Sequence, residues 1–307
     1  MKTGSVGLLL IALVCVPRLV VAQNFVPGTG QRLAKVGDDF EDAKWAYNYN
    51  LPKSSDENDK QQRVPGGESV NGRWYEGVMR GQPDLIKRVA TPEGGIASSE
   101  GSLLMRSKQT GVPGSYSGKN QQDDLIVNVS GRLGGPVPIS RSPSVVVRVF
   151  LPPWEEWEQR TGNSFGFRTA CEAYKTQKKR WGSSGTKLET FWPGMFIHFN
   201  KADAKNTENS ATLILRAGPQ GHDFFGPKIT ETGWWTLGMS FSSDGQVHYY
   251  AHLGVENLTA KDHISSQVPY SLRGERLDAF FFNVVNADNG TWSTSWIIDD
   301  PALYVLR

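Results

Sequence analysis

The chain has 307 residues, of which 33 are Lys or Arg and 31 are Asp or Glu, giving a formal net charge of +2. This balance argues against a nucleic-acid-binding protein, because such domains carry a basic excess or stripe. No internal apolar run is long enough to suggest a membrane span. The 33 Gly and 17 Pro predict a globular chain with many turns.

The N-terminus has the pattern of a signal peptide over residues 1–22. A positive start at Met1-Lys2 precedes an apolar run over residues 6–16, and Val20-Val21-Ala22 has the small-residue pattern of a cleavage site. We expect cleavage after Ala22, which leaves no membrane span and sends the protein to the exterior, the periplasm or the cell envelope. The alternative is an uncleaved anchor.

Cleavage would leave one cysteine, Cys171, since Cys15 lies in the signal peptide. One cysteine cannot form an intramolecular disulfide, so stability must come from a large core. Cys171 ends the apolar stretch 164–171, which favours a buried structural thiol over a nucleophile.

In chain order, residues 23–36 are expected to be a flexible lead and residues 37–46 a first strand with an acidic edge. Residues 50–100 contain four prolines and a charged cluster, and predict an irregular insertion with a short amphipathic piece near 84–89. We see no boundary that splits residues 37–307, which predicts a single domain.

After residue 100 the pattern becomes that of strands. Short runs rich in β-branched and aromatic residues alternate with Gly, Pro, Asn and Asp clusters, at 101–108, 144–151, 164–171, 194–199, 211–217, 235–241, 246–252, 277–285 and 296–306. Asp244-Gly245 predicts a hairpin between two of them. Only 122–129 and 154–160 are candidate helices. These features predict an all-β, two-sheet antiparallel sandwich of the jelly-roll type.

Three local patterns then converge on a family. They are Asp39-Phe40-Glu41-Asp42 with Trp45, the segment 233–241 that leads through Asp244-Gly245 into 246–250, and Ile297-Ile298-Asp299-Asp300 with the apolar 303–305. In this order they resemble the concanavalin A-like lectin/glucanase jelly rolls, including the laminin-G-like modules. The resemblance implies that the final strand pairs with the first. It leaves activity open, because this family contains lectins, carbohydrate-binding modules, hydrolases and lyases.

The acidic ends of the domain are a candidate calcium site. Asp39 and Glu41 near one end would meet Asp299 and Asp300 near the other if the terminal strands pair, and hard oxygen ligands suit Ca²⁺. Jelly-roll binding modules of this type hold structural calcium beside such strands. The alternative is that these carboxylates cap turns or face solvent.

Aromatic side chains are the candidate glycan contacts. Trp181 and Trp192 occur in polar, Gly-rich loop sequence, with Arg180 beside the first, and Tyr249 lies in a strand. The alternative for each aromatic is core packing. The basic run 175–180 predicts either a solvated loop or a contact for an acidic polysaccharide.

Catalytic signals are incomplete. Gln246-Val247-His248 matches a tripeptide of alginate-lyase-type jelly rolls, but their other two strand motifs are absent, which favours a chance match. His248 could act as a base only if it faces the concave surface, and it alternates with Tyr249. The paired-carboxylate motif of laminarinase-type members is also absent.

The leading hypothesis is therefore a secreted, non-catalytic jelly roll that binds a polysaccharide or another cell-surface glycan. The alternatives are a polysaccharide-degrading enzyme, either hydrolase or lyase, with an atypical site, and a structural protein of the cell envelope or matrix.

Overall fold

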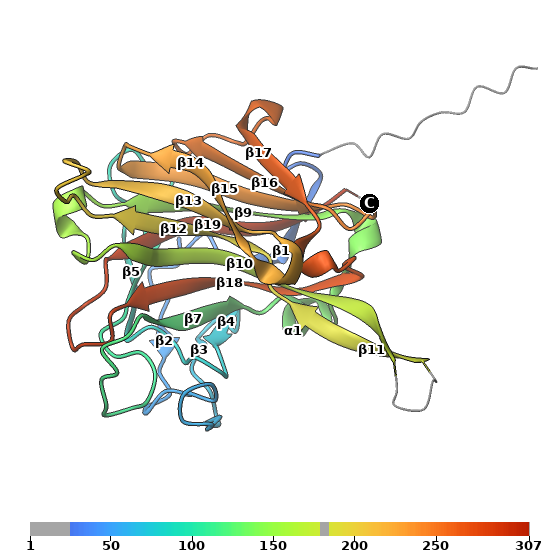
Figure 1. Cartoon of the computed structure of the whole chain (residues 1–307), viewed down its shortest axis with the longest axis horizontal. Coiled ribbons are helices and arrows are strands. Elements are labelled where there is room, and N and C mark those ends of the chain that lie inside the picture. The colour runs from blue at the N-terminus through green and yellow to red at the C-terminus, as the bar shows by residue number, and fades with distance from the viewer. Residues whose placement is uncertain (1–24, 179–183, 307) are drawn as a thin grey trace, which may run out of the picture.

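A computed structural model of the chain describes residues 25–178 and 184–306. It is an antiparallel two-sheet jelly-roll sandwich, as the sequence predicts (Figure 1). Within the described residues no helix has the length and apolar character needed to cross a membrane.

Sheet A contains the C-terminal strand as an interior strand. Its order is β17 (His263–Gln267), β16 (Val247–Leu253), β15 (Gly233–Phe241), β9 (Pro143–Leu151), β19 (Trp296–Val305), β6 (Gly101–Arg106) and β5 (Leu85–Ala90), and β1 (Gln31–Gly37) also pairs with β19. The Asp244-Gly245 turn joins β15 to β16, with Gly245 at φ +92°, which confirms the predicted hairpin.

Sheet B carries the longest strand. Its order is β14 (Asp223–Ile229), β13 (Ser210–Arg216), β12 (Gly194–Asn200), β10 (Gly162–Lys178), β18 (Arg276–Asn286), β7 (Gln121–Val127), β4 (Trp74–Glu76), β3 (Glu68–Ser69) and β2 (Tyr47–Asn48). The strand β11 (Ser184–Phe191) pairs with β10 in a ribbon that projects from the sandwich, and β8 (Val137–Pro138) pairs with β18. The one α-helix of the described residues is short, α1 (Val129–Leu133).

The core lies between the two sheets and is strongly aromatic. Phe165 of β10 packs on Trp296 of β19, with ring centroids 5.0 Å apart, and on Phe282 of β18 at 5.8 Å. Five of the nine tryptophans that the structure describes are buried. Cys171 is also buried, which confirms the structural thiol, and burial raises its pKa to about 12. Core packing therefore accounts for much of the aromatic content.

The N-terminal elements differ from the expectation. The supposed flexible lead 23–36 supplies most of β1, and residues 38–46 form a loop instead of a strand. Asp38 organises that loop by accepting hydrogen bonds from Trp45 Nε1 at 3.0 Å, Trp74 Nε1 at 3.1 Å and Asn71 Nδ2 at 2.8 Å. Phe40 adopts φ +56°, which ends extended structure there. The first and last strands do pair, as the resemblance implies.

Residues 50–100 are less irregular than expected. The strands β3 and β4 extend sheet B beyond β7, and the predicted amphipathic piece is β5 at the edge of sheet A. Strands of two or three residues are too short to produce a recognisable alternation, and pairing with β7 stabilises them.

Neither candidate helix forms as such. The segment 122–129 lies mostly in β7, where Asp123, Leu125 and Val127 alternate inward. The segment 154–160 contains only a single 3₁₀ turn at Trp154–Glu156. In both cases pairing and burial outweigh weak helical propensity.

Candidate functional site

Polar side chains gather on the outer face of sheet B. Successive residues of a strand point to opposite faces, so Met195, Ile197 and Phe199 of β12 enter the core while Phe196 and His198 face outward. The same alternation presents Ile214 and Arg216 of β13 on the outer face. Because Phe196 pairs with Ile214 and His198 with Thr212, these outward residues form rows across the sheet.

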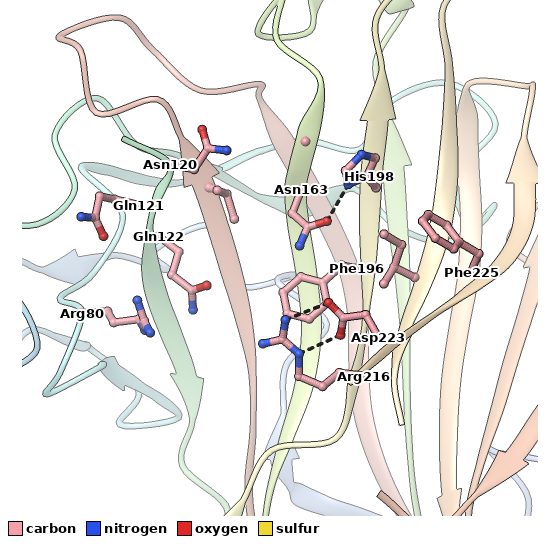
Figure 2. A pocket seen from close by; sticks show the side chains of 13 residues that line it. Arg80, Asn120, Gln121, Gln122, Asn163, Phe196, His198, Arg216, Asp223 and Phe225 are labelled. Carbon is pink, nitrogen blue, oxygen red and sulfur yellow. Dashed lines mark hydrogen bonds and ion pairs between the residues drawn. The ribbon is translucent and has the colours of Figure 1, made fainter. Parts of the chain in front are cut away.

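A groove of about 440 Å³ crosses this face (Figure 2). Its lining comes from six strands and two loops, and consists of Arg80, Asn120, Gln121, Gln122, Gly162, Asn163, Phe196, His198, Ile214, Arg216, Asp223, Phe225 and Val285. The strands run from β7 to β14, which at the usual spacing between strands corresponds to roughly 24 Å. A groove of this length suits an extended ligand.

Arg216 is held rigidly in the groove. Its Nε donates to Asp223 Oδ1 at 2.9 Å and its Nη2 to Asp223 Oδ2 at 3.0 Å, and its guanidinium lies 4.7 Å from the Phe196 ring centroid. The hydrogen bonds that Arg216 donates to Asp223 raise the pKa of Arg216. Such a bidentate pair fixes the guanidinium plane and leaves Nη1 free to donate.

A second arginine lies beside the groove on the same face of sheet B. The guanidinium of Arg168 is 5.4 Å from the Phe196 centroid and 5.3 Å from that of Phe281, and burial lowers its pKa to about 10. Its Nη2 donates to the carbonyl of Trp192 at 3.1 Å. Arg168 therefore supports the floor of the groove and ties it to the loop before β12.

His198 and Asn163 form a pair in the groove. His198 Nδ1 lies 2.9 Å from Asn163 Oδ1, and Figure 2 shows the two side chains meeting. Burial, with a smaller contribution from Arg160, lowers the pKa of His198, so its imidazole is neutral near pH 7. An amide oxygen only accepts, which assigns the proton to Nδ1 and leaves the Nε2 lone pair free.

The opposite wall of the groove is rich in amides. Gln122 Nε2 donates to Asp124 Oδ1 at 3.0 Å, and Asn283 Nδ2 donates to the same oxygen at 2.6 Å. Asp124 is half-buried beside them, and desolvation raises its pKa. Asn120 and Gln121 complete the wall.

One aromatic ring at the groove is open to solvent. The side chain of Phe225 on the edge strand β14 is 81% exposed and lies at one side of the groove, where it pairs with Ile214 of β13 (Figure 2). A flat ring in this position is free to stack on an apolar ligand face.

The predicted glycan contacts are not brought together. Trp192 is 39% exposed, so it stays a candidate contact, but it does not line the groove. Tyr249 is fully buried in the core and donates to the carbonyl of Arg216 at 3.4 Å, so its predicted role in binding is wrong. Trp181 and Arg180 lie outside the described residues.

His248 does not lie on the groove face of sheet B. It lies in β16 of sheet A, is fully buried, and is 2.9 Å from Ser242 Oγ and 2.7 Å from Ser266 Oγ. Because Tyr249 points into the core, His248 points to the outer face of sheet A, away from sheet B. The predicted role as a base facing a concave surface is therefore wrong.

The four predicted calcium ligands are held by other partners. Asp300 bonds Arg32 at 2.6 Å and Arg148 at 3.0 Å, and Glu41 accepts the backbone N–H of Glu100 at 3.1 Å. Asp39 accepts from the backbone of Glu41, and Asp299 is buried with one oxygen unpaired. In residues 25–178 and 184–306 no three His, Cys, Asp or Glu side chains cluster as metal ligands. Calcium stays a prediction.

The groove residues were not identified from the sequence. Asn163, His198, Arg216 and Phe225 come from separate strands, and each occurs as one polar or aromatic residue in an alternating run. The available signal was the single polar residue on the solvent side of each predicted strand, for example His198 within Gly194–Phe199.

No family model and no curated protein matches the sequence. Among solved structures, the chain is similar to a carbohydrate esterase from the Shiga toxin-encoding bacteriophage phi24B, with 10% identity over 77% of this chain and 91% of that chain and a TM-score of 0.45. It is similar to an alginate lyase from Pseudomonas aeruginosa, with 8% identity over 73% and 87% and a TM-score of 0.38. It is also similar to the Emp46p carbohydrate recognition domain, with 13% identity over 76% and 88% and a TM-score of 0.37. Likeness at this level carries no argument about activity, so the function of this jelly roll has to be inferred from the groove itself.

Proposed function

We propose that this protein binds a polysaccharide chain along the sheet B groove without cleaving it. The observation that carries the proposal is the groove itself, which is open, crosses six strands and is lined by hydrogen-bonding side chains. A shallow, elongated site of this kind suits a polymer better than a compact small molecule, which pockets enclose.

The chemistry of the lining supports a sugar ligand. The amides of Gln121, Gln122 and Asn163 offer donors and acceptors, and Arg216 offers the N–H groups that Asp223 does not use. Sugar hydroxyls both donate and accept, and sugar rings present C–H faces that stack on an exposed aromatic plane such as Phe225. Hydroxyl recognition and ring stacking are therefore available in one groove.

The same residues support a binding role over hydrolysis. Glycosidases use two carboxyl groups that flank the scissile bond. The groove lining contains one carboxylate, Asp223, and both of its oxygens accept from Arg216. Cys171 is buried in the core with a raised pKa, which makes it a poor nucleophile.

A second candidate function, cleavage by β-elimination, is favoured by one observation. His198 is neutral near pH 7, is oriented by Asn163 and has a free Nε2, which are properties of a general base. In that case polymer incubated with the protein would gain unsaturated ends, detected by ultraviolet absorbance, and His198→Asn would abolish them. Binding with no change in polymer length supports the proposed function.

The test of the proposal is affinity electrophoresis of the purified protein through gels containing a panel of polysaccharides. We expect retardation in at least one gel, and a loss of about tenfold in affinity for Asn163→Ala, which is about 1.4 kcal/mol. Asn206→Ala, in an exposed loop, is the matched control. If no polysaccharide retards the protein, the proposal fails.

We also propose that the protein works outside the cytoplasm, based on the signal-peptide pattern of residues 1–22. A structural role in the envelope or matrix would instead predict that the protein co-fractionates with the envelope whether or not the groove is intact. Fractionation of cells that express the Asn163→Ala protein distinguishes a structural role from a role that depends on binding in the groove.

A further inference from the structure

The cations that line the groove are neutralised by the protein itself. Arg216 is bound through two hydrogen bonds by Asp223, and Arg80 forms an ion pair with Glu57. Behind the lining, Arg160 is paired with Glu158 at 2.9 Å. Each guanidinium of this group therefore already has a carboxylate partner.

The remaining charged groups do not change this balance. Arg168 is buried against the rings of Phe196 and Phe281, and the nearby Asp124 interacts electrostatically with both Arg168 and Arg80. His198 is neutral near pH 7 because burial lowers its pKa. The rest of the lining is made of amides and apolar groups. A ligand in the groove thus meets paired charges and neutral dipoles.

This arrangement disfavours a polysaccharide that carries carboxylate or sulfate groups. Asp223 already occupies the Nε and Nη2 side of Arg216, so an anionic group could reach only the remaining N–H groups and would be repelled by the nearby Asp223 carboxylate. A neutral chain has no such cost, because its hydroxyls bond to amides and to the free N–H groups of the arginines. Sites that recognise anions usually leave the guanidinium fork unpaired.

From these contacts we infer that the groove selects an uncharged polysaccharide, an inference that rests on the binding function proposed above. Binding should depend little on ionic strength, because it uses dipoles and stacking in place of net charge. Asp223 acts as a selectivity residue that keeps Arg216 unavailable to acidic polymers.

The experiment compares neutral polymers (xylan, galactomannan, laminarin) with acidic ones (alginate, polygalacturonate) by affinity electrophoresis at about 50 mM and about 500 mM NaCl, which changes the Debye length roughly threefold. We expect a neutral polymer to bind with less than about a twofold change between the two salt concentrations, and the acidic polymers not to bind. Asn163→Ala should weaken the neutral interaction.

Asp223→Asn provides the converse test. It removes the partner charge of Arg216, so binding of polygalacturonate should appear or increase by at least about fivefold at low salt, a change of about 1 kcal/mol. Glu93→Gln makes the same charge change at an exposed residue whose loop packs on sheet A, and should have no effect. Salt-sensitive binding of an acidic polymer that Asn163→Ala abolishes would overturn the inference but leave the proposed function intact. Failure of every polymer to bind would overturn both.

Discussion

Lys53 and Asp123 form a buried ion pair, with Lys53 Nζ 2.6 Å from Asp123 Oδ2. Lys53 is 6% exposed and Asp123 is fully buried. The same ammonium group also bonds Asp84 at 3.0 Å and the carbonyl of Gln82 at 3.2 Å. The pair therefore connects the segment 50–100 to β7, the strand that carries one wall of the groove. Burial raises the pKa of Asp123, and Lys53 opposes that shift.

We predict that Lys53→Met destabilises the protein by about 3–5 kcal/mol, because it leaves a buried carboxylate without its cation. The double variant Lys53→Met with Asp123→Asn should recover a large part of this loss. Urea denaturation measures the free energy of unfolding, and Lys87→Met at an exposed position is the control. Equal destabilisation by the single and double variants would contradict this account.

The exposed ring of Phe225 should contribute to ligand binding. Phe225→Ala removes the stacking surface, and we expect it to weaken polysaccharide binding by about five- to tenfold, or about 1 to 1.4 kcal/mol. Phe224→Ala is a matched control, because the ring of Phe224 belongs to the neighbouring residue, is 42% exposed and does not line the groove. Affinity electrophoresis reports binding, and thermal melting verifies that both variants fold. Equal binding by the two variants would show that Phe225 makes no contact with the ligand.

His248 should make stability depend on pH. Burial is the main cause that lowers its pKa; the nearby Asp244 opposes this shift and His263 adds to it. His263 also shares Ser266 Oγ with His248. A histidine whose folded pKa lies below its unfolded value of about 6.5 resists protonation in the fold. Its contribution to stability is therefore complete above about pH 6.5 and is lost as pH falls from that value through the lower folded pKa.

We expect His248→Asn to reduce the slope of unfolding free energy against pH between about pH 6.5 and 5. The largest possible reduction is one proton, or about 1.4 kcal/mol per pH unit. His222→Asn, which changes an exposed imidazole, serves as the control. An unchanged slope in His248→Asn would show that this side chain is not the sensor.

Calcium binding by Asp39, Glu41, Asp299 and Asp300 is open to a direct test. A bound ion would raise the melting temperature with added Ca²⁺ and lower it with EDTA, since a ligand that binds only the folded state stabilises it. Asp299→Asn should then remove the difference. Identical melting in Ca²⁺ and EDTA, with no calcium retained in equilibrium dialysis, would refute the prediction.

Signal-peptide cleavage predicts that the exported protein begins at Gln23. The intact mass of protein purified from the medium or periplasm checks this prediction. Retention of residues 1–22 in the purified protein would favour the uncleaved anchor.

Much of the fold could be predicted because strands in the second half of the chain have a clear local pattern. Runs such as 144–151 and 277–285 are long and rich in β-branched or aromatic residues, and both are strands in the structure. The edge strands β5 and β14 were missed as strands, because β5 is short with two adjacent charges and β14 contains Gly, Pro and charged residues. Such segments are stabilised by pairing with a neighbour, which a local pattern does not reveal.

The candidate site was harder to predict for a geometric reason. Asn163 and His198 are 35 residues apart, and they meet because β10 and β12 pair in a register that sets them opposite each other. Arg216 and Asp223 meet in the same way through β13 and β14. Register depends on contacts along whole strands, so these pairs are not visible in any single motif.

By itself, the sequence determined the all-β class and the alternation of His248 with Tyr249. The tertiary structure decided which of the four sheet faces each alternating side chain meets. The two-residue period of a strand means that successive side chains point to opposite faces of the sheet. It does not determine which face is buried or which sheet holds the groove. The packing of the two sheets placed Tyr249 in the core and His248 on the outer face of sheet A. It also gathered His198, Arg216 and Phe225 on one open face of sheet B.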